Sequence, residues 1–306
     1  MIINTGNRTD IPAFFSKWFF NRLHAGFVDV KNPYASNQYW RYLLNPNVVD
    51  VIAFCSKNPK PMLDDTNEMN YLLSTYKTFW YMTITPYSTD IEKKVPDIKT
   101  SIETFKTLSN MVGKNVVGWR YDPILFGNGW NIQWHLKAFT DIAAELNGYT
   151  NRVVISFLDN YQKVAKNAAF AVRPDNNAQC KLVKELVQIA NANNMELYVC
   201  HDENKLFASY GANVTGCASL KMIENATGFT LKPRKKQNAR NGCNCILNAD
   251  IGMYNTCLHE CAYCYANINH EEAKHSYLFH DVNSSCIIGQ VTAEDEIKQM
   301  KQESWI

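Results

Sequence analysis

Residues 48–59 read VVDVIAFCSKNP, an apolar run that ends in a polar stretch containing proline. Six further short runs rich in β-branched or aromatic residues occur along the chain, and stretches with helical periodicity separate them. Strands that alternate with helices predict parallel βα units. The predicted strands are MIIN (1–4), GFVDV (26–30), VVDVIAF (48–54), TFWYMTIT (78–85), NVVGWRY (115–121), RVVISF (152–157) and MELYVC (195–200), with a weaker eighth around residues 213–217.

The helical stretches between these runs have recognisable ends. Ser36 precedes NQYWRYLL, and Pro96 with Asp97 precedes residues 98–112, which stop at Gly113. Serine and aspartate favour the position before a helix, proline favours its first turn, and glycine favours the position after it. Apolar residues recur at intervals of three and four, which predicts helices with one face toward the core.

The composition suits a large globular protein. The chain has 306 residues, of which 46% are hydrophobic, and its formal net charge of +2 gives no strong bias toward nucleic acid or membranes. No apolar run reaches the length that spans a bilayer. The N-terminus MIINTGNRTD lacks the basic and apolar parts of a signal peptide. We therefore expect a cytoplasmic protein, in which ten cysteines indicate metal binding or reactivity more than disulfides.

The predicted strands all fall within about the first 225 residues, close to the usual size of a (β/α)8 barrel. The predicted fold class is therefore α/β, a (β/α)8 TIM-type barrel over residues 1–225. Residues 226–306 are predicted to form a basic loop, a cysteine-rich segment that caps the strand ends, and a terminal helix after Thr292. An open doubly wound sheet is the alternative, although no G-x-G-x-x-G turn follows MIIN to support nucleotide binding.

The cysteine-rich segment contains CLHECAYCYAN, residues 257–267, in which Cys257, Cys261 and Cys264 have the spacing C-x3-C-x2-C. A cubane iron–sulfur cluster takes one thiolate per iron, so three cysteines leave one iron open to an outside ligand. This spacing, together with Tyr263, favours a [4Fe-4S] cluster over zinc, which prefers closed tetrahedral sites. Zinc binding and thiols that bind nothing are the two alternatives.

Four other cysteines form a second candidate group of metal ligands. Cys243 and Cys245 precede the motif as C-x-C, and Cys200 and Cys217 follow the seventh and eighth predicted strands. Four thiolates would complete a second cluster with no open iron. Alternatively, Cys243 or Cys245 supplies a fourth ligand to the first cluster, or Cys200 and Cys217 are small buried core residues. His259 and His270 could ligate a metal, but a histidine inside or after a cysteine loop is more often an exposed spacer.

Charged residues directly follow several predicted strands, where a barrel places its active site. Arginine offers a planar fork for a carboxylate or phosphate, aspartate can accept hydrogen bonds from a ribose or an amine, and lysine can contact an anion or donate a proton. Turns and caps are the ordinary role of polar residues after strands. The predicted catalytic residues are Arg8, Asp10, Lys57, Arg120 and Asp122, and the predicted cofactor-binding residues are Tyr263 and Asn58.

Residues 231–242, LKPRKKQNARNG, form a basic stretch without apolar periodicity. Such a charge run is usually solvated, but beside a reactive cluster it could hold an anionic substrate or a nucleic-acid backbone. The nearly balanced charge of the whole chain disfavours nucleic acid.

Several motifs together resemble those of one protein family. They are NRTDIPAFF (7–15), NP (32–33), SKNP (56–59), WRYDPI (119–124), CNC (243–245) and DIGMYNTCLHECAYCYAN (250–267). This pattern looks like a bacterial family of uncharacterised function whose C-terminal cysteine cluster is similar to that of radical SAM proteins, especially spore photoproduct lyase. It departs from the radical SAM pattern in two ways. The triad follows the last predicted strand instead of the first, and no GGE-like motif occurs.

The resemblance implies a barrel that carries a [4Fe-4S] cluster, possibly two, with S-adenosylmethionine on the open iron. It implies a radical SAM-like enzyme that acts on a small-molecule substrate and takes electrons from a donor such as flavodoxin or ferredoxin. In a closed barrel the eighth strand lies beside the first, so a segment that leaves strand eight reaches the same mouth. A non-catalytic iron–sulfur protein for electron transfer or sensing, or a zinc-binding protein, is the alternative.

Overall fold

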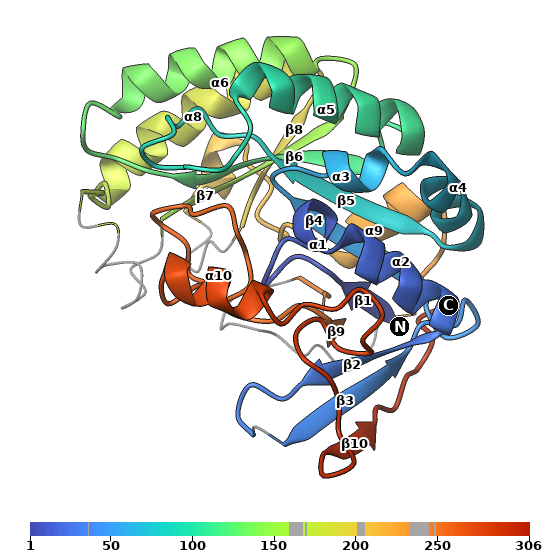
Figure 1. Cartoon of the computed structure of the whole chain (residues 1–306). Coiled ribbons are helices and arrows are strands. Elements are labelled where there is room, and N and C mark those ends of the chain that lie inside the picture. Colours follow the sequence, from blue (N-terminus) through green and yellow to red (C-terminus); the bar gives the residue numbers. More distant parts are fainter. Residues whose placement is uncertain (36, 159–167, 169, 201–205, 233–244, 248) are drawn as a thin grey trace.

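The computed structural model describes residues 1–35, 37–158, 168, 170–200, 206–232, 245–247 and 249–306. Within these residues the chain forms one large sheet, one small sheet and a set of helices (Figure 1). None of the helices in this part of the chain is both long and apolar enough to cross a membrane.

The large sheet has seven strands in the order β8-β7-β6-β5-β4-β1-β9, and every neighbouring pair is parallel. An α/β fold built on a parallel sheet is therefore confirmed. The strands are β1 (Ile2–Asn4), β4 (Val51–Ser56), β5 (Thr78–Thr83), β6 (Val117–Ile124), β7 (Arg152–Phe157), β8 (Glu196–Val199) and β9 (Ala249–Asp250).

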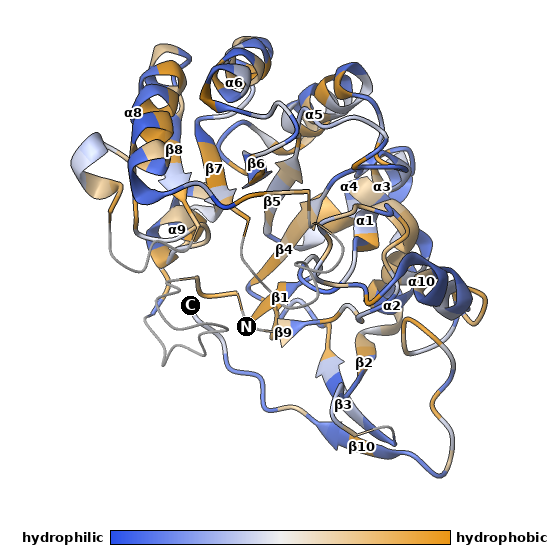
Figure 2. Ribbon diagram, turned by 90° about the vertical axis from the view of Figure 1, so that its left-hand side faces the viewer, coloured by the Kyte–Doolittle hydropathy of each residue, from blue (hydrophilic) through white to orange (hydrophobic). Residues whose placement is uncertain are grey.

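Alternate residues of these strands belong to two different cores, because successive side chains of a strand point to opposite faces. On β4, Ile52 and Phe54 belong to the core under the helices, whereas Val51 and Ala53 belong to a second core on the other face. Three long helices cover the first face, with their hydrophobic sides toward the sheet (Figure 2). They are α5 (Ile98–Val112), α6 (Ile132–Leu146) and α8 (Asn176–Ala192).

The second core includes residues from the C-terminal part of the chain. Met222 and Ile223 of α9 (Leu220–Thr227), together with Ile246 and Trp305, pack with the sheet residues of this face. The remaining helices are α1 (Ile11–Phe14), α2 (Ser16–Ala25), α3 (Lys60–Leu63), α4 (Thr66–Thr75), the 3-10 helix η1 (Ala208–Tyr210) and α10 (His270–Tyr277).

Two short segments extend the sheet at its edges. Asn213 forms a parallel bridge with Tyr198 of β8, and Ile246, just before β9, donates its backbone N–H to the Ala218 carbonyl at 3.0 Å. This arrangement is compatible with a barrel. The described strands β8 and β9 are nevertheless not paired with each other, so the sheet is open in the described residues and does not show the predicted closed barrel.

Two predictions for residues 26–44 are wrong. GFVDV was expected in the large sheet and NQYWRYLL as a helix, but both form a small separate sheet of order β10-β3-β2. Aromatic residues favour strands, and the Arg41 guanidinium pairs across the strands with the buried Asp29 carboxylate at 2.7 Å. Ser36, the predicted cap, lies outside the described residues. The strands are β2 (Phe27–Lys31), β3 (Gln38–Leu43) and β10 (Glu296–Gln299).

The predicted terminal helix after Thr292 is also wrong. The Thr292 N–H and hydroxyl both donate to Asp295, which closes a turn, and β10 then pairs in parallel with β3. In contrast, the helix predicted over residues 98–112 is confirmed as α5. The Asp97 carboxylate accepts the Thr100 N–H at 2.9 Å, and Gly113 follows the last turn with a φ of 95°.

A buried histidine joins α6 to the sheet and makes stability depend on pH. His135 accepts a hydrogen bond from the Tyr121 hydroxyl and donates one to the Leu125 carbonyl, and burial lowers its pKa to about 4. The unfolded chain binds this proton near pH 6.5, so stability falls as the pH falls from about 6.5 to about 4, by roughly 3 kcal/mol in total.

We predict that urea unfolding of the wild type weakens across this pH range and that His135→Gln flattens the dependence. Glutamine can keep one donor and one acceptor at this position but does not titrate. An equally steep dependence in the variant would show that other groups cause it.

Candidate functional site

The cysteine motif lies against the edge of the large sheet where the strands end. Because β1, β4, β5 and β6 are parallel, their carboxyl ends share this edge. The loop between β5 and α5 contacts the motif through its backbone. Cys261 forms an antiparallel bridge with Glu92, and the Ala262 N–H donates to the Ile91 carbonyl at 2.9 Å.

Asp10, a predicted catalytic residue, follows β1 and holds three parts of the chain together. Its carboxylate caps α1 by accepting the Ala13 N–H at 3.1 Å and accepts the Lys57 N–H at 2.8 Å. It also accepts a hydrogen bond from His259 Nε2 at 2.8 Å. Burial disfavours its charge, but the hydrogen bond and charge of His259, with hydrogen bonds from Ser56 and the Lys57 backbone, together lower the pKa of Asp10. His259 is buried, so the expectation of an exposed spacer is wrong.

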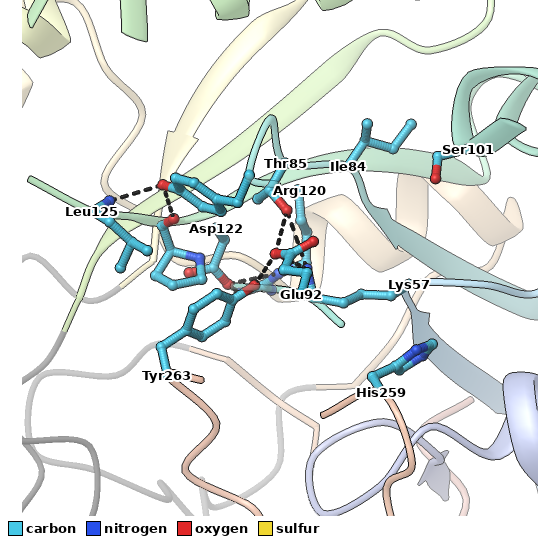
Figure 3. A network of polar contacts seen from close by, with 12 residues as sticks. Lys57, Ile84, Thr85, Glu92, Ser101, Arg120, Asp122, Leu125, His259 and Tyr263 are labelled. Atoms are coloured by element: carbon cyan, nitrogen blue, oxygen red, sulfur yellow. Dashed lines mark hydrogen bonds and ion pairs between the residues drawn. The ribbon is translucent and has the colours of Figure 1, made fainter. Parts of the chain in front are cut away.

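Glu92 forms a second attachment point of the motif, shown in Figure 3. One oxygen of this buried carboxylate accepts hydrogen bonds from the Thr85 hydroxyl at 2.6 Å, the Lys57 ammonium at 3.0 Å and the Tyr263 hydroxyl. Burial lowers the pKa of Lys57, but the charge and hydrogen bond of Glu92, with the charges of Cys261 and Asp122, together raise it. Lys57 therefore carries a positive charge inside the site.

His259 lies between Cys257 and Cys261 in the sequence, and Tyr263 lies between Cys261 and Cys264. Each spacer of the motif thus contributes one buried side chain that is fixed by one buried carboxylate. We call the contacts Asp10–His259 and Glu92–Tyr263 the two latches of the cysteine loop, residues 256–266.

Of the three cysteines of the motif, Cys261 is buried and Cys257 and Cys264 are partly exposed, and their thiols act on one another electrostatically. Burial raises the pKa of all three, and for Cys257 the nearby Cys264, Asp10 and Cys261 raise it further. Backbone N–H groups oppose this effect. The backbone N–H of His259 donates a hydrogen bond to the Cys257 sulfur. The backbone N–H groups of Ala266 and Asn267 donate hydrogen bonds to the Cys264 sulfur. Lys57 lowers the pKa of both Cys261 and Cys264.

Arg120 and Asp122, two further predicted catalytic residues, form an ion pair within β6, in its middle and carboxyl-terminal part. Arg120 Nε donates to Asp122 at 3.1 Å, and the Ser156 hydroxyl donates to the other carboxylate oxygen. Burial raises the pKa of Asp122, but Arg120 and Ser156 reverse the shift, and Lys57 contributes to lowering it. The pair therefore belongs to the same charged group as Lys57.

Arg8 is paired away from this group, and Asn58 serves as a turn residue. Arg8 Nε donates to the Asp250 carboxylate at 2.9 Å, which ties the loop after β1 to β9. Gly6 in that loop has no room for a side chain, because a Cβ there would lie 2.6 Å from the Cys55 carbonyl oxygen. Asn58 Oδ1 accepts the Lys60 N–H at 3.3 Å, where α3 begins.

The second group of predicted ligands is brought together on the other core. Cys217 Sγ lies 2.9 Å from Cys245 Sγ, and Cys217 also hydrogen-bonds Cys200. Arg120 acts electrostatically on Cys200 and Cys217. Cys243 lies outside the described residues, as does nearly all of the basic stretch 231–242.

Among the residues that the structure describes, no group of three or more His, Cys, Asp or Glu side chains is arranged to hold a metal ion. A cavity of about 40 Å³ lies beside Thr85, Glu92 and Ser101. By the same kind of measure one water needs about 10–15 Å³, so this cavity has room for water next to Glu92.

Sequence reasoning missed Glu92, Asp250 and the role of His259. Neither acid follows a predicted strand, and nothing in the local sequence of Glu92 distinguishes it from a solvated acid. Asp250 begins the motif DIGMYNTCLHECAYCYAN, but the motif does not indicate its partner. The position of His259 inside the cysteine spacing was the one available signal. Its partner Asp10 is far away in the sequence, so the contact could not be inferred.

Comparisons with known proteins place the chain in a family without giving it an activity. The model of the family described as "Domain of unknown function (DUF1848)" matches residues 2–266, so the chain belongs to this family. No curated protein matches the chain.

Two solved structures show a weak likeness. One is a D-hydantoinase, with 10% identity and a TM-score of 0.30, and it is matched over 68% of this chain and 42% of its own. The other is a D-hydantoinase from Bacillus sp. AR9, with 10% identity, a TM-score of 0.28 and the same coverage. The chain spans less than half the length of these enzymes, and the likeness is too weak to carry a conclusion.

We predict that Asp10→Asn and Glu92→Gln each loosen the cysteine loop. Each change removes a buried charge from a hydrogen-bonded network and should lower the free energy of unfolding by about 3 kcal/mol. Amide hydrogen exchange of residues 256–266 should become several-fold faster in both variants, measured under conditions where each variant remains folded.

Asp29→Asn is the matched control, because Asp29 is equally buried and paired but lies in the small sheet with Arg41. It should lower stability without a selective change at residues 256–266. If loop exchange is the same in all three variants, the latches do not order the loop.

Proposed function

We propose that this member of the DUF1848 family is a radical SAM-like enzyme whose [4Fe-4S] cluster is bound by Cys257, Cys261 and Cys264. One observation carries the proposal. Three thiols of a single short loop, one buried and two partly exposed, act on one another electrostatically, and two latches fix this loop beside the charged strand ends.

The environment of the sulfur atoms fits such a cluster. Backbone N–H groups point at Cys257 and Cys264, and hydrogen bonds to sulfur are a common feature of iron–sulfur sites, where they tune the reduction potential. Thiolates in a buried position need positive charge nearby. Lys57 supplies one such charge beside Cys261 and Cys264, and the irons would supply the rest.

When bound, the cluster and S-adenosylmethionine together supply one-electron radical chemistry. The residues of this chain position the reactants and exclude water. Lys57, Arg120 and Asp122 form a buried group of mixed charge beside the loop, suited to a small polar substrate. Because each of these charges already has a partner, a substrate must share or exchange those partners. Tyr263 and Asn58 are the proposed cofactor contacts.

We also propose a closed eight-membered barrel with the cysteine loop as its cap. The Asn213–Tyr198 bridge and the Ile246–Ala218 hydrogen bond support it, because they place residues 213–218 and 246–247 between β8 and β9. The ring would then contain β1, β4, β5, β6, β7, β8, the 213–218 segment and β9. The proposed setting is the cytoplasm, with an electron donor such as flavodoxin or ferredoxin, and nucleic acid is not favoured.

We predict that anaerobic reconstitution with iron and sulfide gives one cubane cluster on these three cysteines. Electron paramagnetic resonance of the reduced protein should change when S-adenosylmethionine is added, because the cofactor binds the open iron, and 5'-deoxyadenosine should form. The triple variant C257A/C261A/C264A should lose the cluster, whereas Cys286→Ser, a buried cysteine outside the loop, should keep it.

Three outcomes separate the alternatives. Stoichiometric zinc without colour would reject the cluster. A cluster that is insensitive to S-adenosylmethionine would indicate a redox or sensor protein. Full iron content in the triple variant would place the cluster elsewhere.

We predict that Lys57→Met lowers the reduction potential of the cluster, because it removes a positive charge that stabilises the more negative reduced state. Lys57→Arg should leave the potential close to that of the wild type. A potentiometric titration measures both, and an unchanged potential in Lys57→Met would contradict the assigned role of Lys57.

A further inference from the structure

Three thiols outside the cysteine loop have no role in the proposed function, although the fold brings them into contact. Cys217 Sγ and Cys245 Sγ are 2.9 Å apart, and Cys200 hydrogen-bonds Cys217. Cys200 and Cys217 are buried, whereas Cys245 is partly exposed. Cys245 is therefore the thiol that a molecule from solution meets first.

Backbone contacts hold Cys217 and Cys245 in adjacent segments, one beside β8 and the other just before β9. The Ile246 N–H donates to the Ala218 carbonyl at 3.0 Å, so the residues next to the two cysteines already lie side by side. The Tyr81 hydroxyl of β5 donates to the Cys217 carbonyl, which anchors that segment from the sheet. The two sulfur atoms thus face each other across segments that are 28 residues apart in sequence.

We propose that Cys217 and Cys245 form a reversible disulfide that joins these two segments, by exchange with a low-molecular-weight disulfide. A disulfide places its sulfurs about 2 Å apart, so the pair needs a movement of only roughly 1 Å. The proposal is independent of the cluster on Cys257, Cys261 and Cys264.

The exchange balances in two steps. The Cys245 thiolate attacks the external disulfide, forms a mixed disulfide and releases one external thiolate, which takes up the proton that Cys245 lost. Cys217 then loses its proton, its sulfur attacks the Cys245 sulfur, and the second external thiol leaves. In sum, two protein thiols lose two electrons and two protons, and one external disulfide becomes two thiols.

The local charges set the speed of this reaction. The hydrogen bond with Cys200 lowers the pKa of Cys217, but the contact with Cys245 and burial raise it more, to about 12. Because the thiolate is the reactive species, the second step is slow. Arg120 acts in the opposite direction on Cys217 and favours the thiolate. We therefore expect slow oxidation, and we expect Cys245 to react first because it is partly exposed whereas Cys200 and Cys217 are both buried.

The bond would change the stability of the fold. A crosslink between residues that are distant in sequence restricts the unfolded chain and so stabilises the folded protein. Here it would also connect the segment beside β8 to the segment before β9. The oxidised protein should therefore have a higher Tm than the reduced protein.

The test uses full-length protein purified anaerobically and then treated with glutathione disulfide. Free thiols are alkylated, and peptides are mapped by mass spectrometry without reduction. We expect a crosslinked peptide containing Cys217 and Cys245, the loss of two alkylated thiols, a raised Tm and complete reversal by dithiothreitol. Cys217→Ser and Cys245→Ser should each abolish the crosslink and the rise in Tm.

Cys180→Ser and Cys200→Ser are the controls. Cys180 is a buried cysteine of α8 away from the pair, and Cys200 tests whether the third thiol is needed, so both variants should still form the crosslink. If a variant fails to fold, the presence or absence of the Cys217–Cys245 crosslinked peptide in the oxidised wild type still tests the proposal. Persistence of both thiols, pairing with Cys243 or Cys200, or a second iron–sulfur cluster on these cysteines would overturn the proposal.

Discussion

The buried carboxylate of Asp10 is the contact on which the arrangement of the site depends. It accepts hydrogen bonds from the start of α1, from the backbone after β4 and from His259 of the cysteine loop. These groups are far apart in the sequence and meet only because the ends of parallel strands share one edge. Leaving a buried charge without its hydrogen-bond donors costs free energy. The hydrogen bond from His259 therefore stabilises the packing of the cysteine loop against the sheet. In the same way, the buried Glu92 carboxylate accepts hydrogen bonds from Lys57, Thr85 and Tyr263, the last of which belongs to the cysteine loop.

The charged residues of the site are satisfied mainly by one another. Arg8 pairs with Asp250, Lys57 with Glu92, and Arg120 with Asp122. Such pairing keeps buried charges tolerable, and it also fixes where the positive charge of the site lies. Lys57 lowers the pKa of two thiols of the motif, Cys261 and Cys264. The acids and bases at the strand ends therefore serve first to hold the loop and to place this charge.

The sequence predicted the large sheet well where local signals agreed with tertiary packing. The runs that became β4, β5, β6, β7 and β8 are long, apolar and bounded by polar turns, and α5 has both a cap and a stop signal. The helix predicted for residues 37–44 is wrong because apolar residues at helical spacing are also compatible with a strand. The contact that favours the strand pairs Arg41 with Asp29, a residue of the neighbouring strand β2. β9 has two residues and no pattern of its own.

The same limit applied to the site. Residue type and spacing pointed to Cys257, Cys261 and Cys264 and to the charges after the strands, because those signals are local. The pairing of His259 with Asp10, and of Tyr263 with Glu92, depends on contacts across most of the chain and left no pattern in the sequence. The spacers of the motif contribute buried side chains that are hydrogen-bonded to buried carboxylates.

The most direct measurement is an anomalous difference map at the iron edge from a crystal of the anaerobically reconstituted protein. We expect iron density bonded to the sulfurs of Cys257, Cys261 and Cys264, with one iron that has no protein ligand. Density absent from this loop, or four irons all bound by protein side chains, would contradict the proposed open cluster.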